Sequence, residues 1–131
     1  MLEQLQLDRR LQLALDALAF EATTEVQDQV IPAALAGEDL VVSAETGSGK
    51  TLAYLVPMVQ QLLHPETPRA DGPQGLILVP TRELARQVLT QCRALLAKTP
   101  LQVYGITGGA AFRYQQSLFR KNPEIIVATP G

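Results

Sequence analysis

The sequence has a single cysteine and no excess of basic residues. Cys92 cannot form an internal disulfide, and its spacing from Leu84 and Val88 predicts a buried position on one face of a helix. With 11 Lys and Arg against 13 Asp and Glu, the net charge is −2. This balance argues against a chain that grips nucleic acid by overall charge, although a local basic patch remains compatible with phosphate contacts.

Long apolar runs are also missing. No stretch approaches the roughly 18 apolar residues of a membrane span, and the N-terminus lacks the basic start and apolar run of a secretion signal. These absences predict a cytoplasmic protein without membrane contact. The 131 residues, 47% apolar and 18% charged, are typical of one globular domain, and they contain no internal repeat.

Apolar runs and helical repeats alternate along the chain. Leu11, Leu15 and Leu18 recur with helical spacing after Asp8, a candidate N-cap, and a second helix is predicted to begin near Thr24. The predicted helices cover 9–18, 50–63, 82–96 and 113–119, and the predicted strands cover 39–42, 75–79, 101–106 and 125–128. Because these strands are apolar throughout, we expect an α/β fold in which helices flank a parallel sheet.

Residues 44–51, AETGSGKT, match the phosphate-binding loop pattern, except that Ala44 replaces its first glycine. Glycines let the backbone turn so that amides point at phosphate oxygens, and the following helix N-terminus adds partial positive charge. Lys50 is predicted to reach the β- and γ-phosphates, as the candidate catalytic residue, and Thr51 to bind Mg²⁺. The predicted nucleotide-binding residues of this loop are Thr46, Gly47, Ser48, Gly49, Lys50 and Thr51. The alternative is a glycine-rich turn that carries a solvated lysine.

Residues 20–27, FEATTEVQ, resemble the Q motif that precedes the phosphate loop in DEAD-box RNA helicases, and their distance from Lys50 also matches. The resemblance implies that Gln27 selects ATP, because its amide offers one donor and one acceptor to adenine N6 and N7. It also implies that Phe20 lies near the base and that Thr24 supports the phosphate loop. Without the family, Gln27 would be a solvated helix residue and Phe20 a core residue.

Three further segments follow predicted strand ends and are similar to the RNA-contacting motifs of the same family: 80–84 (PTREL), 107–109 (TGG) and 129–131 (TPG). In open α/β sheets, ligands bind beyond the carboxyl ends of the strands. The resemblance implies contacts with the RNA backbone that do not read its sequence. The implied RNA-binding residues are Pro80, Thr81, Arg82, Gly108, Gly109, Thr129, Pro130 and Gly131. Arg82 is equally compatible with a structural ion pair.

Taken together, the resemblance identifies residues 1–131 as part of the first RecA-like domain of a DEAD-box RNA helicase, from the Q motif to the start of motif Ib. The family unwinds or remodels RNA with ATP and Mg²⁺, and the short segment before the Q motif is typical of bacterial members. The Asp-Glu-Ala-Asp segment, the Ser-Ala-Thr segment and the second RecA-like domain are not among these residues. We therefore expect this chain alone to bind nucleotide weakly, to lack helicase activity and to self-associate through uncovered strands.

Two other functions remain open. Another P-loop protein, such as a kinase or a transporter ATPase, shares the phosphate loop but has no need of Gln27 or of residues 80–84. A non-enzymatic interaction module would keep the fold and bind a partner protein without nucleotide affinity. Nucleotide binding that depends on Lys50 separates the second alternative from the other two functions.

Overall fold

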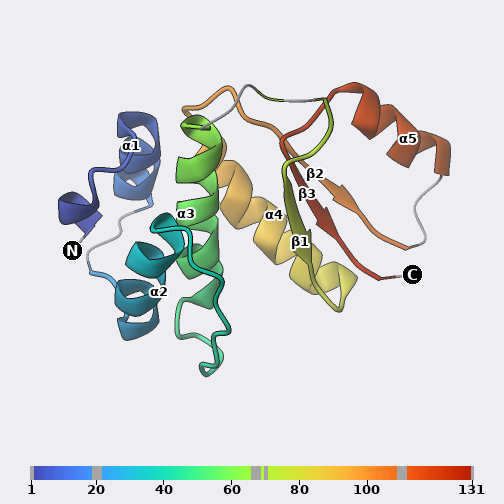
Figure 1. The fold of residues 1–131 in the computed structure, drawn as a ribbon. Coiled ribbons are helices and arrows are strands. Elements are labelled where there is room, and N and C mark those ends of the chain that lie inside the picture. The colour runs from blue at the N-terminus through green and yellow to red at the C-terminus, as the bar shows by residue number, and fades with distance from the viewer. Residues whose placement is uncertain (1, 19–21, 66–68, 70, 109–111, 131) are drawn as a thin grey trace.

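The computed structural model describes residues 2–18, 22–65, 69, 71–108 and 112–130 of the chain (Figure 1). The elements, after a short 3₁₀ helix at Leu2–Leu5, are α1 (Arg9–Ala17), α2 (Glu25–Leu35), α3 (Lys50–Leu63), β1 (Gly75–Leu78), α4 (Arg82–Leu96), β2 (Val103–Ile106), α5 (Phe112–Arg120) and β3 (Ile125–Ala128). The predicted helices and the last three predicted strands are confirmed, and their bounds differ only at the ends of the elements.

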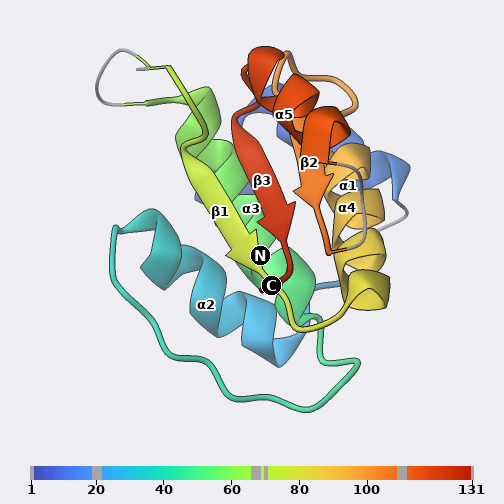
Figure 2. The ribbon, with the colours of Figure 1, turned by 90° about the vertical axis from the view of Figure 1, so that its right-hand side faces the viewer.

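The described strands form one parallel sheet in the order β1-β3-β2. In its register, Leu78 of β1 and Ile106 of β2 both lie opposite Ala128 of β3. The three strands therefore end at the same edge of the sheet, where their arrowheads lie together in Figure 2. This common carboxyl edge confirms the α/β class and determines which loops can act together.

Helices α3 and α4 pack on one face of the sheet, and α1 and α2 lie outside them (Figures 1 and 2). The core between these layers consists of aliphatic side chains with almost no exposed surface. Its largest members include Leu11, Ile31, Leu55, Val59, Val88, Leu95, Ile125 and Val127. Burying each such side chain contributes about 1.5–3 kcal/mol to folding, so this layer holds the helices against the sheet.

Cys92 lies in the same layer, fully buried on α4 beside Val88. Burial raises the pKa of its thiol to about 12, because the thiolate would lose its hydration there. The thiol therefore stays protonated and packs as a small apolar group, as the sequence predicts.

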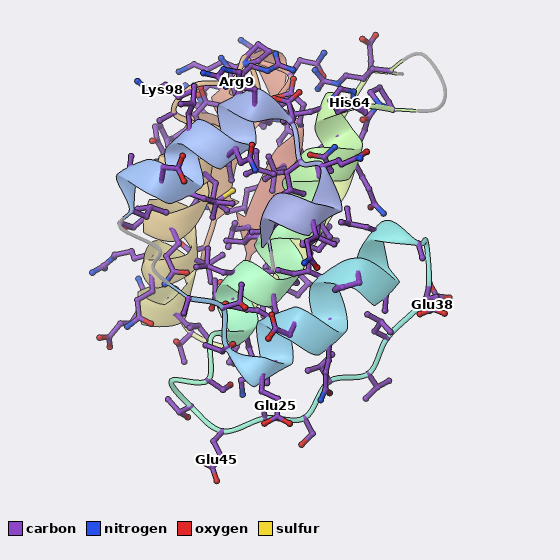
Figure 3. The ribbon with its side chains drawn as sticks, turned by 90° about the vertical axis from the view of Figure 1, so that its left-hand side faces the viewer. Arg9, Glu25, Glu38, Glu45, His64 and Lys98 are labelled. Carbon is purple, nitrogen blue, oxygen red and sulfur yellow. The ribbon has the colours of Figure 1, made fainter. Side chains whose placement is uncertain are left out.

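The strand predicted over residues 39–42 is wrong. The described segment 38–45 has no regular secondary structure, and it runs outside α2, apart from the three strands, in Figures 2 and 3. Val41 is 102% exposed, and Leu40 and Val42 are each 42% exposed. An apolar run favours burial, but a strand also needs a neighbour that pairs with its amides and carbonyls. No described strand provides that pairing here.

The start of α1 is tied to the end of α3 through Asp8, the predicted N-cap. Its carboxylate accepts bonds from the Arg10 backbone N–H at 2.8 Å, from the Arg10 side chain at 3.0 Å, and lies 2.8 Å from His64 Nε2. The Asp8 backbone N–H donates to Gln60 Oε1 at 2.7 Å. The hydrogen bonds from Arg10 hold the pKa of the Asp8 carboxyl well below its usual range, against the opposing effect of burial.

We expect Asp8→Ala to lower the free energy of unfolding by about 1–2 kcal/mol at neutral pH, the usual cost of losing an N-cap. Because the folded-state pKa is depressed, this contribution is fully present above the unfolded pKa of 3.8 and is lost progressively as pH falls from there toward the folded-state pKa. Denaturant unfolding at neutral pH and at pH about 3 measures both effects.

Asp16→Ala is the matched control, since Asp16 is exposed on the same helix. A difference between Asp8→Ala and the parent chain that persists unchanged at the lower pH contradicts the assignment to the charged carboxylate.

Candidate functional site

The phosphate loop turns through two glycines with left-handed backbone. Gly47 has a φ of 83° and Gly49 a φ of 87°, and residues other than glycine rarely adopt this backbone region. Gly49 is also the N-cap of α3, and it makes no side-chain cap, so the first amides of the helix are not covered by a capping side chain. Uncapped amides and the helix dipole at this position suit an anion.

Two polar side chains of this loop also fit a phosphate group. Lys50 is exposed, and its Nζ folds back to donate to the Ala44 carbonyl at 2.5 Å. Ser48 Oγ is buried and has no hydrogen-bond partner among the described residues. A buried hydroxyl without a partner is costly, and an oxygen-rich ligand in the loop would relieve that cost. The loop therefore presents hydrogen-bond donors, the first amides of α3 and the Ser48 hydroxyl, that a bound phosphate could use.

A groove of about 880 Å³ extends from this loop toward the sheet. One side carries Thr46, Lys50 and Thr51 of the loop and of α3, and the other carries Leu76 and Leu78 of β1. Its volume is in the range of small-molecule sites, and Thr46, Lys50 and Thr51 supply polar groups at the loop end. The groove continues to Pro80 and Leu84 at the start of α4.

Gln27 is buried at 2% exposure and ties α2 to the phosphate loop. Its Nε2 donates to the Gly49 carbonyl at 3.1 Å, and its Oε1 accepts from the Thr24 backbone N–H at 3.0 Å. Thr24 Oγ1 accepts in return from the Gln27 backbone N–H at 3.3 Å, which completes a capping box at the start of α2. A methyl group on Gly49 would overlap Gln27 Nε2 and lie 3.0 Å from Thr24 Oγ1.

The alternative of a solvated Gln27 is therefore wrong, and Thr24 does lie against the loop. Within the chain, the amide uses one of its two N–H groups and one of the two lone pairs on its oxygen. One N–H and one lone pair remain for an adenine edge, but the side chain is almost fully buried, so its role as adenine reader stays a prediction. Phe20 lies outside the described residues.

The segments predicted to contact RNA meet at the carboxyl edge of the sheet. Thr81 follows β1 and caps α4 by accepting from the Leu84 backbone N–H at 3.1 Å. Gly108 follows β2, and its N–H donates to Thr129 Oγ1 beyond β3 at 3.4 Å. Pro80 and Pro130 are exposed beside them. The fold thus brings together three segments that are far apart in sequence, while Gly109 and Gly131 lie outside the described residues.

Arg82 is exposed and forms no ion pair with a described acidic side chain. The structural ion pair considered for it is therefore absent from the described part of the chain.

Within the described residues, no group of three or more His, Cys, Asp and Glu side chains could hold a metal ion, and no helix is suited in length and apolarity to crossing a membrane.

Sequence reasoning missed two features of this site. No sequence pattern indicates the hydrogen bond from Gln27 to Gly49, because its acceptor is a backbone carbonyl, which every residue has. The exposed Leu76 and Leu78, at 61% and 64%, were predicted to be covered on both faces of the sheet. Their strand alternates buried and exposed positions along its length, which is typical of a strand with one covered face.

Comparisons with known proteins agree with this geometry. The family model described as DEAD/DEAH box helicase matches residues 24–131. The ATP-dependent RNA helicase SrmB of Escherichia coli is 44% identical over 128 residues, which cover 98% of this chain and 29% of that protein. The ATP-dependent RNA helicase drs1 of Schizosaccharomyces pombe is 40% identical over 129 residues, with 98% of this chain and 17% of that protein covered.

Among solved structures, the RNA-helicase Prp28 from Chaetomium thermophilum bound to ADP superposes with a TM-score of 0.83 at 40% identity. The match covers 95% of this chain and 31% of that one. The chain thus spans less than a third of the length of each of these relatives. Their similarity confirms the RecA-like α/β fold with flanking helices.

We expect Gln27→Ala to lower the free energy of unfolding by about 1–3 kcal/mol, because it removes the partners of the part-buried Gly49 carbonyl and Thr24 backbone N–H. Thermal and denaturant unfolding provide the measurement. Gln29→Ala is the matched control, since Gln29 is exposed on the same helix and should change stability by less than about 0.5 kcal/mol. Equal effects of the two substitutions would mean that the Gln27 bonds do not hold α2 on the loop.

Proposed function

The chain belongs to the DEAD/DEAH box helicase family, and we propose that it forms the ATP-binding and RNA-contacting part of an ATP-dependent RNA helicase. The observation that carries the proposal is the phosphate loop at the start of α3, held from behind by the buried Gln27 bond to Gly49. Such a loop binds the phosphates of a nucleotide through backbone amides. Family membership argues against another class of P-loop protein.

ATP and Mg²⁺ are the proposed cofactors. Lys50 would leave the Ala44 carbonyl to reach the phosphates, and Thr51, at the first turn of α3, would bind Mg²⁺ through its hydroxyl. Thr46, Gly47, Ser48 and Gly49 would supply the loop amides. Gln27 and Phe20 would lie at the base, and Thr24 would support the phosphate loop. Bound Mg²⁺ would neutralise charge on the phosphates. The similar Prp28 structure is bound to ADP, which supports an adenine nucleotide here.

RNA is the proposed partner, held at the carboxyl edge of the sheet. Thr81, Gly108 and Thr129 follow the three strands there, and Arg82 adds an exposed cation at the start of α4. Backbone amides, hydroxyls and an arginine suit phosphates and sugars, so these contacts would not read the base sequence. The full proposed set also contains Pro80, Gly109, Pro130 and Gly131.

For the whole protein we propose ATP hydrolysis coupled to local unwinding or remodelling of RNA, since its relatives are named ATP-dependent RNA helicases. Residues 1–131 would belong to the first of two RecA-like domains and by themselves would bind nucleotide weakly without unwinding RNA. Bacterial and fungal relatives have similar sequence identity to the chain, so a bacterial origin stays a prediction. A cytoplasmic location also stays a prediction.

Self-association of this chain is a further part of the proposal. Leu76 and Leu78 expose apolar surface on one face of β1, and the outer edge of β1 has no described strand beside it. An open edge with free amides and carbonyls pairs readily with another chain. A second copy could cover both the edge and the apolar face.

We expect calorimetric titration to give tighter binding of Mg·ADP than of Mg·GDP, because the Gln27 amide complements adenine and not guanine. Lys50→Ala should weaken ADP binding by about 10–100-fold, the effect of losing hydrogen bonds from a charged group. Lys98→Ala is the control, since Lys98 is exposed beyond the end of α4.

Equal binding of ADP and GDP would contradict the role of Gln27. Binding of neither nucleotide, together with intact binding of a protein partner, would favour the interaction module instead.

We expect light scattering over a range of concentrations to show dimers or larger species of the parent chain, and Leu76→Lys/Leu78→Lys to shift them to monomers. Charges on the exposed face of β1 would have to be buried in the assembly. Leu13→Lys is the control, because Leu13 is 41% exposed on α1. A parent chain that is monomeric at every concentration would overturn this part of the proposal.

A further inference from the structure

The charge of the chain is divided sharply along its length. Residues 82–131 contain seven Lys and Arg against two Asp and Glu, whereas residues 1–81 contain four against eleven. The two acidic residues of the basic part are Glu83 and Glu124, and Glu124 is already engaged by Arg69 and by the Gln102 backbone N–H. The net charge of −2 therefore conceals a basic C-terminal part.

Three of these arginines share one face of α4. Arg82, Arg86 and Arg93 occur at intervals of four and seven residues, with Leu89 between the last two. Leu89 packs directly against Gly105 of β2: a Cβ atom at Gly105 would lie 2.7 Å from Leu89 Cδ1. The arginine face is thus directed to the side of α4 that lies along β2, the sheet edge away from β1 (Figure 2).

A groove of about 190 Å³ runs between α4, β2 and α5 at this edge. Arg82, Arg86, Arg93, Tyr104, Thr107 and Tyr114 line it. All three arginines are exposed, and none forms an ion pair with a described acidic side chain. At 1.5 Å per residue, Arg82 and Arg93 are about 16 Å apart along the helix, enough to face several phosphates of one strand.

The two tyrosines differ in availability. Lys121 lies over the Tyr104 ring, 5.5 Å from its centroid, so that ring already has a cationic partner. Tyr114 on α5 is 62% exposed, and its ring is open to solvent. Exposed aromatic rings beside cations stack the bases of single-stranded nucleic acids, whereas a folded duplex hides its bases.

We propose that this α4–α5 groove is a second RNA-binding site, which takes a single strand leaving the carboxyl edge of the sheet. Arg86 and Arg93 contact successive phosphates, and Tyr114 stacks on an unpaired base. Arg82 belongs to both sites, so the strand is continuous between them. The proposal rests on the proposed function, because it needs RNA at Thr81 and Arg82 first. An acidic peptide fits the arginines but gives Tyr114 no base to stack on.

The test is fluorescence anisotropy of the 131-residue chain with a labelled single-stranded RNA of about 12 nucleotides, which exceeds what the sheet edge alone would cover. We expect Arg86→Gln/Arg93→Gln to weaken binding about tenfold at low salt. The slope of log affinity against log salt should fall by about 1.4, because each single-strand phosphate contact contributes about 0.7. Tyr114→Leu should weaken binding several-fold, and Tyr114→Phe should retain it.

Arg9→Gln/Lys98→Gln is the matched control, since it removes two exposed positive charges from the face shown in Figure 3, away from α5. Unchanged ADP affinity in each variant shows that the fold and the nucleotide site persist. If the two double variants bind RNA equally well, the groove is not an RNA site. The same conclusion follows if polyglutamate binds with the same dependence on Arg86 and Arg93 and Tyr114→Leu leaves RNA binding unchanged. A parent chain that binds ADP but no RNA overturns this inference together with the RNA part of the proposed function, and leaves its nucleotide part intact.

Discussion

β3 pairs in parallel with both β1 and β2, so the two strands that precede it in the chain meet only through it. Parallel neighbours require crossover connections, which α4 and α5 provide, and the common register aligns all three carboxyl ends. Thr81, Gly108 and Thr129 come together at one edge for this reason alone. The same alignment places the start of α4, with its exposed arginine, beside the other two strand ends.

The phosphate loop is held by a different device, because no described strand leads into it. Gln27 bonds to the Gly49 carbonyl, and the capping box with Thr24 fixes the start of α2 against that loop. A buried amide with both bonds made is stabilising, while the same amide with one bond missing is costly. Any nucleotide that recruits Gln27 therefore acts on the loop and on α2 together.

Charge separates the two ends of the chain in space as well as in sequence. Glu25, Glu38 and Glu45 lie along α2 and the segment that leads to the phosphate loop (Figure 3), whereas the exposed arginines of α4 face the opposite sheet edge. An acidic surface repels a nucleic-acid backbone, and a basic groove attracts it. If the chain binds RNA as proposed, this charge distribution would direct the strand toward α4 and α5 and away from α2.

The sequence by itself determined the helices, the strands β1, β2 and β3, and the glycine-rich loop, because helical spacing, apolar runs and turn chemistry are local properties. It also carried the family resemblance that the comparisons confirmed. Only the tertiary structure decided that residues 39–42 are not a strand, that Gln27 is buried, and that Arg86, Arg93 and Tyr114 share one groove. Each of these depends on a partner distant in the chain, such as a pairing strand, a backbone carbonyl or a facing helix, and local patterns do not specify that partner.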